Sequence, residues 1–469
     1  MNTNIILEVI SAMFYFREEE KAVLKQFVAS DMDKAMAVYG RRRTGKTSLI
    51  MEYYQSAEKG QCVYYQCTSY HYQTCLKDFI GIVQAFVADS SLLKRAETFR
   101  EVFLYLTQTG VEGKIFMIDE FPFLAKKNED AAVEFQWIID HGLGKNKLIL
   151  LGSSLSFMKR QIGDREAPLY GRFQRIIELQ PFSFQEVHRL FPSFEEAVAV
   201  YARTGGVALY VMLYKQYSSV QEGDKALFFQ PGGEMLHEAE NLLMQELREV
   251  STYVAILRAI GAGEKESSQI AERSGLDQRA VFGYLNKLID LNIISLVVNP
   301  LAAKQKTNRY MISDLLYRFH YTFIEPNISM ITTLHGDAMP FILNDQYHEY
   351  LGFVYEMIIR GQCFHYGLQG VIPFMPKVIG KWWGNIQENG SWKESEVDVV
   401  AFNDKNIVIG ECKYRNKQVG VNELTFLQLK SQFMPIKGRK ITYLLASKSG
   451  FTEELKRLQN QDLVLIDQL

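Results

Sequence analysis

The segment GRRRTGKT at residues 40–47 constrains the fold of this 469-residue chain more than any other feature. It follows the apolar run AMAVY at residues 35–39 and precedes a segment of helical periodicity. Loops with two glycines at this spacing join a buried strand to a helix in parallel α/β sheets. The sequence therefore predicts a strand, a tight loop and a helix here.

Three later apolar runs continue the pattern, each followed by a longer stretch of helical period: CVYYQC at 62–67, KIFMID at 114–119 and KLILLGSS at 147–154. Alternating strands and helices favour a parallel sheet with helices on both faces. Strands buried on both sides read as unbroken apolar runs. Since the chain is too long for one ordinary core, we predict a multidomain α/β protein whose first domain, residues 1–181, contains this sheet.

The loop residues suit a nucleoside triphosphate bound with Mg²⁺. Two glycines let the backbone wrap a phosphate, and the N–H groups of the loop and the helix N-terminus stabilise its charge. Lys46 would reach the outer phosphates, and the Thr47 hydroxyl would ligate Mg²⁺. The predicted ATP-binding residues are Gly40, Arg41, Arg42, Arg43, Thr44, Gly45, Lys46, Thr47 and Ser48, with Asp119 and Ser153.

Two acidic residues follow the run KIFMI. Asp119 is predicted to hold Mg²⁺ at the end of a buried strand, and Glu120 to act as the general base that polarises the attacking water. An acidic pair can also simply open the helix or loop after a strand. The phosphate loop upstream favours the catalytic interpretation.

Two further positions leave alternatives open. Ser153, beside Ser154, can sense the γ-phosphate or serve as a helix N-cap. Arg172, in PLYGR, can present a cation to the nucleotide within one chain or across a contact in a homo-oligomer, or it can form an exposed salt bridge.

The runs FREEE at 16–20, YGRRRTGKTSLI at 39–50, IDEFPFL at 118–124, LGSS at 151–154, PLYGR at 168–172 and YARTGG at 201–206 resemble the archaeal-type ATPase family of the STAND branch of AAA-like P-loop NTPases. The resemblance covers most of residues 14–250. It implies that Gly40, Gly45, Lys46, Thr47, Asp119 and Glu120 bind or hydrolyse ATP, and it places Arg172 in a family segment. The chain departs from that family where Val207 and Ala208 follow the glycine pair, since relatives carry a proline there.

The middle of the chain is predicted to be helical. Residues 182–250 form a lid of helices, with a turn at Gly205-Gly206. Residues 251–316 show three helical segments, then ISLVV, a turn and RYMIS, the order of a winged helix. Its second helix, 277–290, has two cations, Arg279 and Lys287, against two aspartates. We therefore favour a structural or autoinhibitory role over base readout, although Lys304, Lys306 and Arg309 could touch phosphates.

Residues 317–469 begin with a helical connector to 345 and continue as a second α/β domain, in which the polar stretch GNIQENGSWKES is expected to be a loop. Residues two apart share a strand face, so Glu411 and Lys413 of GECK project together, with Asp398 on the preceding hairpin strand alongside. Such a set can bind Mg²⁺ and direct water at a phosphodiester. Glu356 could complete the metal shell and Gln428 could orient substrate; a solvated strand face is the alternative.

The pattern E…(E)xD…ExK, with GKWWG at 380–384, resembles the restriction-endonuclease-like fold of the PD-(D/E)xK motif, of the uncharacterised kind that often follows archaeal-type ATPases. The resemblance implies a nuclease site at Glu356, Asp398, Glu411 and Lys413, with metal on the three carboxylates. That fold also includes inactive members.

Composition excludes little. The formal net charge of −2 argues against a uniformly basic nucleic-acid-binding surface. No signal peptide and no apolar run near the roughly 18 residues of a membrane helix are visible, so we expect a cytoplasmic protein. The five cysteines fit reduced thiols. We predict an ATP-dependent nuclease acting on DNA; the alternatives are a nucleotide switch whose C-terminal domain only binds nucleic acid or protein, and an ATP-dependent transcription regulator.

Overall fold

A computed structural model describes residues 15–302, 309–388 and 390–467. The chain forms two compact units: Met1–Phe182 with Val207–Tyr210, and Ser183–Gly206 with Val211–Leu469. The finer division into four domains made from the sequence stays a prediction. Within the described residues, no helix has both the length and the apolar character needed to cross a membrane.

A five-stranded sheet forms the centre of the first unit, and all its strands run parallel. The strands are β1 (Ala35–Tyr39), β2 (Cys62–Gln66), β3 (Ile115–Asp119), β4 (Lys147–Gly152) and β5 (Arg175–Glu178), in the order β2-β3-β4-β1-β5. The predicted parallel sheet is therefore confirmed. The fifth strand was not expected, because RIIE is short and carries charges at both ends.

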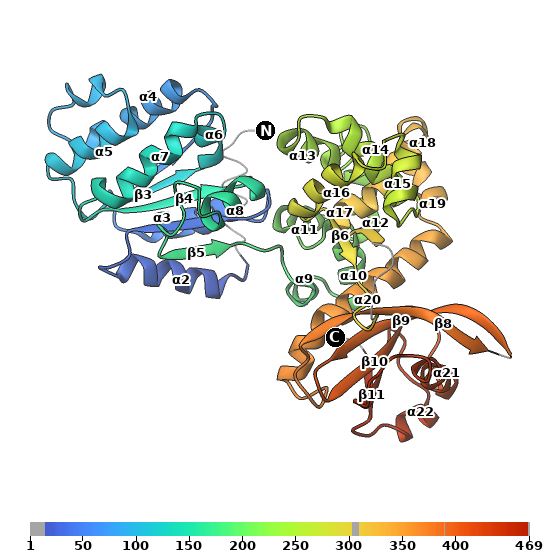
Figure 1. Ribbon diagram of the computed structural model, residues 1–469. Coiled ribbons are helices and arrows are strands. Elements are labelled where there is room, and N and C mark those ends of the chain that lie inside the picture. The colour runs from blue at the N-terminus through green and yellow to red at the C-terminus, as the bar shows by residue number, and fades with distance from the viewer. Residues whose placement is uncertain (1–14, 303–308, 389, 468–469) are drawn as a thin grey trace. The chain divides into compact units, whose positions relative to one another are not determined.

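Helices cover both faces of this sheet (Figure 1). Helices α2 (Glu18–Ala29) and α3 (Lys46–Ser56) pack Leu24, Phe27, Leu49 and Ile50 against one face. The other face is covered by a cluster rich in phenylalanine from α4 (Tyr72–Val83), α5 (Phe99–Gln108), α6 (Phe121–Ala125) and α7 (Glu129–Trp137). Apolar burial on both faces explains why the strands read as unbroken apolar runs.

The strand order decides what meets at the carboxyl edge of this sheet. β4 lies between β1 and β3, with Tyr39 opposite Gly152 and Ile118 opposite Leu150. The ends of these three strands therefore lie side by side. Residues that follow β4 are placed between the phosphate loop after β1 and the acidic pair at the end of β3.

The second unit begins with short helices: α9 (Phe184–Leu190), α10 (Phe194–Thr204), α11 (Ala208–Tyr214), whose first turn groups with the first unit, α12 (Val220–Leu227) and α13 (Glu238–Glu246). The predicted turn at Gly205-Gly206 is present, because both residues adopt positive φ, 57° and 75°, at the end of α10. Three helices and a hairpin follow: α14 (Val250–Gly261), α15 (Ser267–Ser274), α16 (Val281–Asp290), β6 (Ile294–Val297) and β7 (Arg309–Ile312).

A helical connector leads to the last part of the chain: α17 (Leu315–Phe319), η4 (His320–Ile324), η5 (Glu325–Asn327), α18 (Ile328–Leu334), η6 (His335–Ala338), α19 (Met339–Ile342) and the long α20 (Asp345–Leu368). The C-terminal sheet follows, with β8 (Val378–Glu388), β9 (Ser391–Phe402), β10 (Asn406–Lys413), α21 (Val421–Ser431), β11 (Lys440–Ser447), α22 (Glu453–Arg457) and β12 (Leu463–Asp467).

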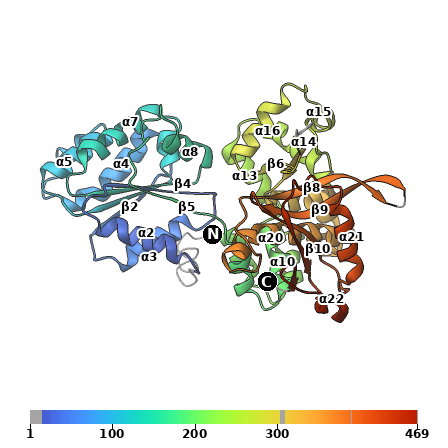
Figure 2. The ribbon, with the colours of Figure 1, turned by 60° about the horizontal axis from the view of Figure 1, so that its bottom comes forward.

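This sheet is mixed, in the order β12-β11-β10-β9-β8. Strands β10, β11 and β12 are parallel, whereas β8, β9 and β10 are joined by antiparallel pairing. Figure 2 shows the β8–β9 ribbon reaching out beyond the rest of the sheet. The polar stretch at 384–395 was expected to be a loop, and that prediction is wrong: it forms the paired ends of β8 and β9. Its side chains are polar because most are exposed on a projecting ribbon.

Candidate functional site

The phosphate loop closes tightly against the sheet. A Cβ atom at Gly40 would lie 2.4 Å from the carbonyl oxygen of Leu179, so only glycine allows this approach. Gly45 begins α3 with φ 96°. Lys46 is 5% exposed and donates to the carbonyl oxygens of Gly40 at 3.0 Å and Arg41 at 2.9 Å. The loop thus curls around the ammonium group at the start of a helix, where anions are favoured.

The two residues predicted to hold Mg²⁺ with the nucleotide are brought together. Asp119, 1% exposed at the end of β3, accepts a hydrogen bond on Oδ2 from the Thr47 hydroxyl at 2.7 Å. The same oxygen accepts from the Tyr64 hydroxyl at 2.9 Å. Burial and the charge of Asp119 raise the pKa of Tyr64, which keeps that phenol a donor. Sequence reasoning missed Tyr64, since a tyrosine inside an apolar strand carries no separate signal.

Glu120 is held by the strand next to its own. Its backbone is left-handed, with φ 53°, and its N–H donates to Asp119 Oδ1 at 2.8 Å. The hydroxyl oxygen of Ser153 lies 2.7 Å from both carboxylate oxygens of Glu120. Ser154, not Ser153, is the N-cap of α8 (Leu155–Gly163). The structure therefore does not show the helix-cap role, which was one of the two interpretations of Ser153.

Basic residues surround the loop. Arg42 approaches Glu120 at 3.9 Å, and the guanidinium of Arg43 lies 5.5 Å from the ring centre of Tyr210. Thr44 is buried and donates to the Arg41 carbonyl at 2.8 Å. Arg17, which sequence reasoning quoted but did not nominate, donates to the Thr44 carbonyl at 3.4 Å and so supports the loop from outside.

Arg172 is not brought to the phosphate loop. It comes three residues before β5, and β5 runs parallel to β1, with Arg175 opposite Met36. It therefore lies at the amino edge of the sheet, whereas the loop lies at the carboxyl edge, a strand length of roughly 15 Å away at about 3.3 Å per residue. Its Nε donates to Asp140 at 3.1 Å, the salt-bridge alternative. A role for Arg172 at a nucleotide would have to come across a subunit contact.

Asp398 and Glu411 are brought together in the second unit. Strands β9 and β10 are antiparallel with Val399 opposite Gly410, so Asp398 and Glu411 follow at the next position of the register. Asp398 accepts from the Cys412 backbone N–H at 2.9 Å. Burial, then the negative charges of Glu356 on α20 and of Glu411, raise the pKa of Asp398 to about 7. Glu356 and Glu411 therefore both lie close enough to act on Asp398.

Lysines complete this carboxylate cluster. Lys413 Nζ lies 2.7 Å from Glu411 Oε1, and Lys430 Nζ, from α21, lies 2.9 Å from Glu411 Oε2. Lys381, from β8, lies 2.8 Å from Glu356 and 3.3 Å from Glu396. Burial opposes the charge of Lys381, yet the surrounding carboxylates raise its pKa.

Sequence reasoning nominated Lys413 but missed Lys381 and Lys430. Lys430 follows the nominated Gln428 by two positions, and Gln428 itself is exposed. Burial also opposes the charge of Lys413, and the carboxylates of Glu411 and Asp398 raise its pKa.

The carboxylate cluster supplies only part of a metal-ion site. Across the described parts of the chain, no group of three or more His, Cys, Asp or Glu side chains is arranged to hold a metal ion. The donor set is nonetheless one of carboxylate oxygens, which hard cations prefer. Asp398 also gains proton affinity from two neighbouring acids, and a divalent cation would relieve that repulsion. Asp398 and Glu411 thus fit as a partial site.

In the segment predicted to be a winged helix, Arg258 pairs with Glu325 and Arg273 pairs with Glu264. Arg309, on β7, pairs with Glu394 at 3.5 Å and lies 5.1 Å from the centre of the Trp383 ring. Lys304 and Lys306 lie outside the described residues.

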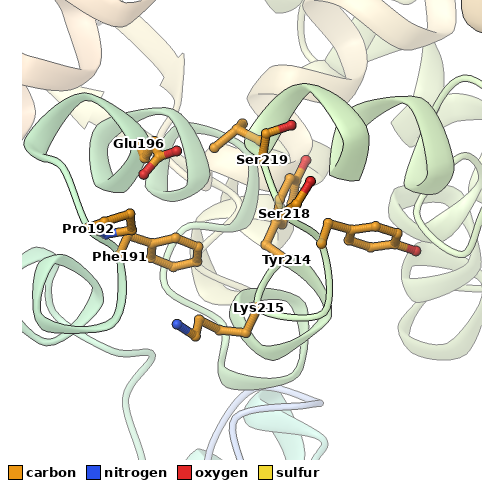
Figure 3. A pocket seen from close by; sticks show the side chains of 9 residues that line it. Phe191, Pro192, Glu196, Tyr214, Lys215, Ser218 and Ser219 are labelled. Atoms are coloured by element: carbon orange, nitrogen blue, oxygen red, sulfur yellow. The ribbon is translucent and has the colours of Figure 1, made fainter.

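A separate small pocket of about 70 Å³ lies among α9–α12, with Glu196, Tyr214 and Lys215 on its walls (Figure 3). It has room for a few water molecules and none for a nucleotide.

Comparisons with known proteins agree with the division between the two sites. Residues 14–212 match a family described as an ATPase domain predominantly from Archaea. Residues 320–424 match a family described as archaeal and bacterial proteins of unknown function. The uncharacterized protein MJECL04 of Methanocaldococcus jannaschii is 28% identical over 97% of this chain and 99% of its own length.

Solved structures give weaker likenesses. The Aeropyrum pernix ORC2 protein is 15% identical, covering 69% of this chain and 97% of that chain, with a TM-score of 0.45. A Signal Transduction ATPase with Numerous Domains from Pyrococcus horikoshii is 16% identical, covering 75% and 50%, with a TM-score of 0.32. At these scores neither establishes a shared overall fold. The chain is thus similar to an archaeal ATPase domain over residues 14–212 and to the second family over residues 320–424.

Proposed function

We propose that this protein hydrolyses ATP, as a member of the STAND branch, and that its nucleotide state controls a metal-dependent nuclease in the C-terminal domain that acts on DNA. The pairing that supports the first part is Thr47 with Asp119, beside a Glu120 that Ser153 holds in place. The second part rests mainly on Asp398 next to Glu411, with Lys413 on the same strand.

At the ATP site each side chain has a separate task. Lys46 neutralises the outer phosphates, and Thr47 and Asp119 hold Mg²⁺ with the nucleotide. Glu120 accepts the proton of the attacking water. Ser153 can donate either to Glu120 or to the γ-phosphate, because it follows β4, which lies between the strand before the phosphate loop and the strand before Glu120. ATP binding would thereby free the base for its water.

At the carboxylate cluster, Asp398 and Glu411 would hold a divalent cation, and Glu356 would join them only on leaving Lys381, with which it is paired at 2.8 Å. Such an ion lowers the pKa of a bound water and stabilises charge on the phosphate. Lys413, 2.7 Å from Glu411, is placed to orient that water. The water oxygen forms the new bond to phosphorus, and the ester oxygen leaves with a proton. The hairpin segment, as a winged helix, would be structural or autoinhibitory.

One observation favours the alternative of a nucleotide switch without nuclease activity. Both carboxylate oxygens of Glu411 are already paired, with Lys413 and Lys430. If no cation displaces these lysines, the C-terminal domain only binds nucleic acid or protein. If the protein forms a homo-oligomer, Arg172 could act on a nucleotide bound by the neighbouring subunit. We propose that the protein is located in the cytoplasm.

The deciding experiment measures ATP hydrolysis and the cleavage of single- and double-stranded DNA with Mg²⁺ or Mn²⁺, with and without ATP. We expect Lys46→Ala to lose ATP hydrolysis and the ATP dependence of cleavage. Lys413→Ala should lose cleavage and retain ATP hydrolysis. Lys417→Ala, an exposed lysine four positions on, is the matched control. Hydrolysis of ATP without any DNA cleavage would support the switch.

A further inference from the structure

A cavity of about 560 Å³ adjoins the carboxylate cluster in the second unit. Its walls come from the end of α14, from β7, from α17 and η4, from α20, and from β8 and β9. Glu356, Lys381 and Glu396, the ion-paired set of the cluster, form one side of it. Of the proposed nuclease residues, Glu356 lines this cavity, so a ligand in it would lie next to one member of the carboxylate cluster.

The hairpin β6–β7 is fixed to the C-terminal sheet, so the cavity has a defined wall. Asn299 donates to the Trp383 carbonyl at 2.9 Å, and Arg309 pairs with Glu394. A Cβ atom at Gly380 would lie 2.9 Å from the ring of Pro300, so the chain before the hairpin turn packs closely on β8. On the opposite side, Gly261 lets α14 approach η4, because a Cβ there would lie 2.7 Å from the Tyr321 carbonyl oxygen.

The guanidinium of Arg318, on the cavity wall, forms no ion pair with a carboxylate of the described residues. Its guanidinium lies 3.6 Å from the centre of the Phe353 ring, and Nη1 donates to the Ile312 carbonyl at 3.1 Å. Its Nε is buried without a hydrogen-bond partner. Burial lowers the pKa of Arg318, with only weak support from Tyr350 and Glu356. Arg318 is half-buried and lines the cavity, so a bound anion can pair with its charge.

Flat side chains line the same cavity. Trp383 is partly exposed and has the Arg309 guanidinium over its ring, and Phe353 and Tyr350 lie on α20. Nucleobases stack on aromatic rings and on arginine planes, whatever the sequence. The volume is within the range of about 300–1,000 Å³ for pockets that enclose small ligands. A volume of about 560 Å³ is enough for one unstacked nucleotide.

We propose that this cavity binds an unpaired nucleotide of a nucleic-acid strand, with a phosphate on Arg318 and the base against Trp383. The proposal rests on the nuclease function proposed above and gives its substrate class: single strands, or ends whose bases are unpaired. The shared chemistry is that of a nucleoside phosphate, so a free nucleotide is the other source to be tested.

The test measures fluorescence anisotropy of a fluorescein-labelled oligothymidylate with the full-length protein, without divalent metal. We expect Trp383→Ala to weaken binding about tenfold or more, as for loss of one stacked base. Trp383→Phe should restore most of it. Arg318→Met should weaken binding and reduce the slope of log affinity against log salt by about one. Arg457→Ala, an exposed cation on α22 outside the cavity, is the control.

Three results would overturn the proposal: no binding of the oligothymidylate, wild-type binding by both Trp383→Ala and Arg318→Met, or competition by duplex DNA or by thymidine monophosphate as strong as by the single strand. Failure of the nuclease is distinguishable. Cavity-dependent binding without any cleavage sinks the nuclease and keeps the cavity. Cleavage that needs Lys413 but is unchanged in Trp383→Ala keeps the nuclease and sinks the cavity.

Discussion

The hydroxyl of Ser153 lies 2.7 Å from each carboxylate oxygen of Glu120, although the two residues come from different strands. The contact exists because β4, which Ser153 follows, lies between the strand of the phosphate loop and the strand of the acidic pair. In the ATP site proposed above, one hydroxyl would then serve both the base and the bound nucleotide.

Ser153→Ala should lower kcat for ATP hydrolysis about tenfold, because Glu120 loses the group that orients it, a part of the roughly 10²–10⁴-fold effect of a general base. The affinity for ATP should change little. Steady-state kinetics and nucleotide binding measure the two quantities separately. Ser154→Ala, the neighbouring serine, should leave kcat near wild type; an equal loss in both variants would contradict the role of Ser153.

Tyr64→Phe should raise the Mg²⁺ concentration needed for half-maximal ATP hydrolysis by about tenfold. The phenol donates to Asp119 Oδ2 at 2.9 Å, and loss of such a supporting hydrogen bond costs roughly 10–100-fold in metal affinity. A Mg²⁺ titration of the rate at saturating ATP measures the change. Tyr105→Phe, whose hydroxyl bonds the Asp89 carbonyl on the surface, should behave as wild type. An unchanged Mg²⁺ requirement in Tyr64→Phe would contradict this.

Asp224→Asn should destabilise the second unit by about 3 kcal/mol, because it leaves a buried arginine unpaired. Arg203 and Asp224 are each 2% exposed, with Nη2 and Oδ2 2.5 Å apart, and Tyr214 also donates to this carboxylate at 2.6 Å. Urea unfolding monitored by circular dichroism measures the loss. Asp404→Asn removes an exposed pair with Lys377 and should change stability little. Equal effects of the two substitutions would contradict the prediction.

Asp398→Asn should stabilise the metal-free protein at pH 8. The folded state holds the Asp398 proton up to a pKa of about 7, while the unfolded chain releases it near 3.8. The folded state therefore binds the proton more tightly, and its stability falls as the pH rises from about 4 to 7. The loss is about 4 kcal/mol at full ionisation. Urea unfolding at several pH values should show the gain shrinking towards pH 4; a gain independent of pH would contradict this origin.

The sequence predicted those elements whose apolar runs and turn residues are visible in a short segment of chain. The phosphate loop, the four strands from Ala35 to Gly152 and the hairpin of Asp398 and Glu411 have apolar runs and turn residues of their own. Strands β5, β8 and β12 were missed, because the first is short and charged and the second is polar on exposed faces. For β12 the sequence shows a short apolar run, which was not assigned.

The supporting residues of both sites could not be predicted, for a common physical reason. Tyr64, Lys381 and Lys430 reach their carboxylates only through strand order and helix packing, which no spacing in the sequence encodes. Arg172 shows the converse. Its segment suggested a nucleotide contact, but the direction of β5 places it at the other edge of the sheet.

The projecting β8–β9 ribbon has a consequence for how the protein behaves in a crowded solution. β8 is an outer strand of the C-terminal sheet, so one row of its N–H and C=O groups has no neighbouring strand in that sheet. A long outer strand of this kind would recruit other chains by edge-to-edge pairing if it were flat and apolar. Glu388 and Lys393 place charges along the ribbon instead. The polar residues that kept β8 from being predicted as a strand also oppose aggregation through this outer strand.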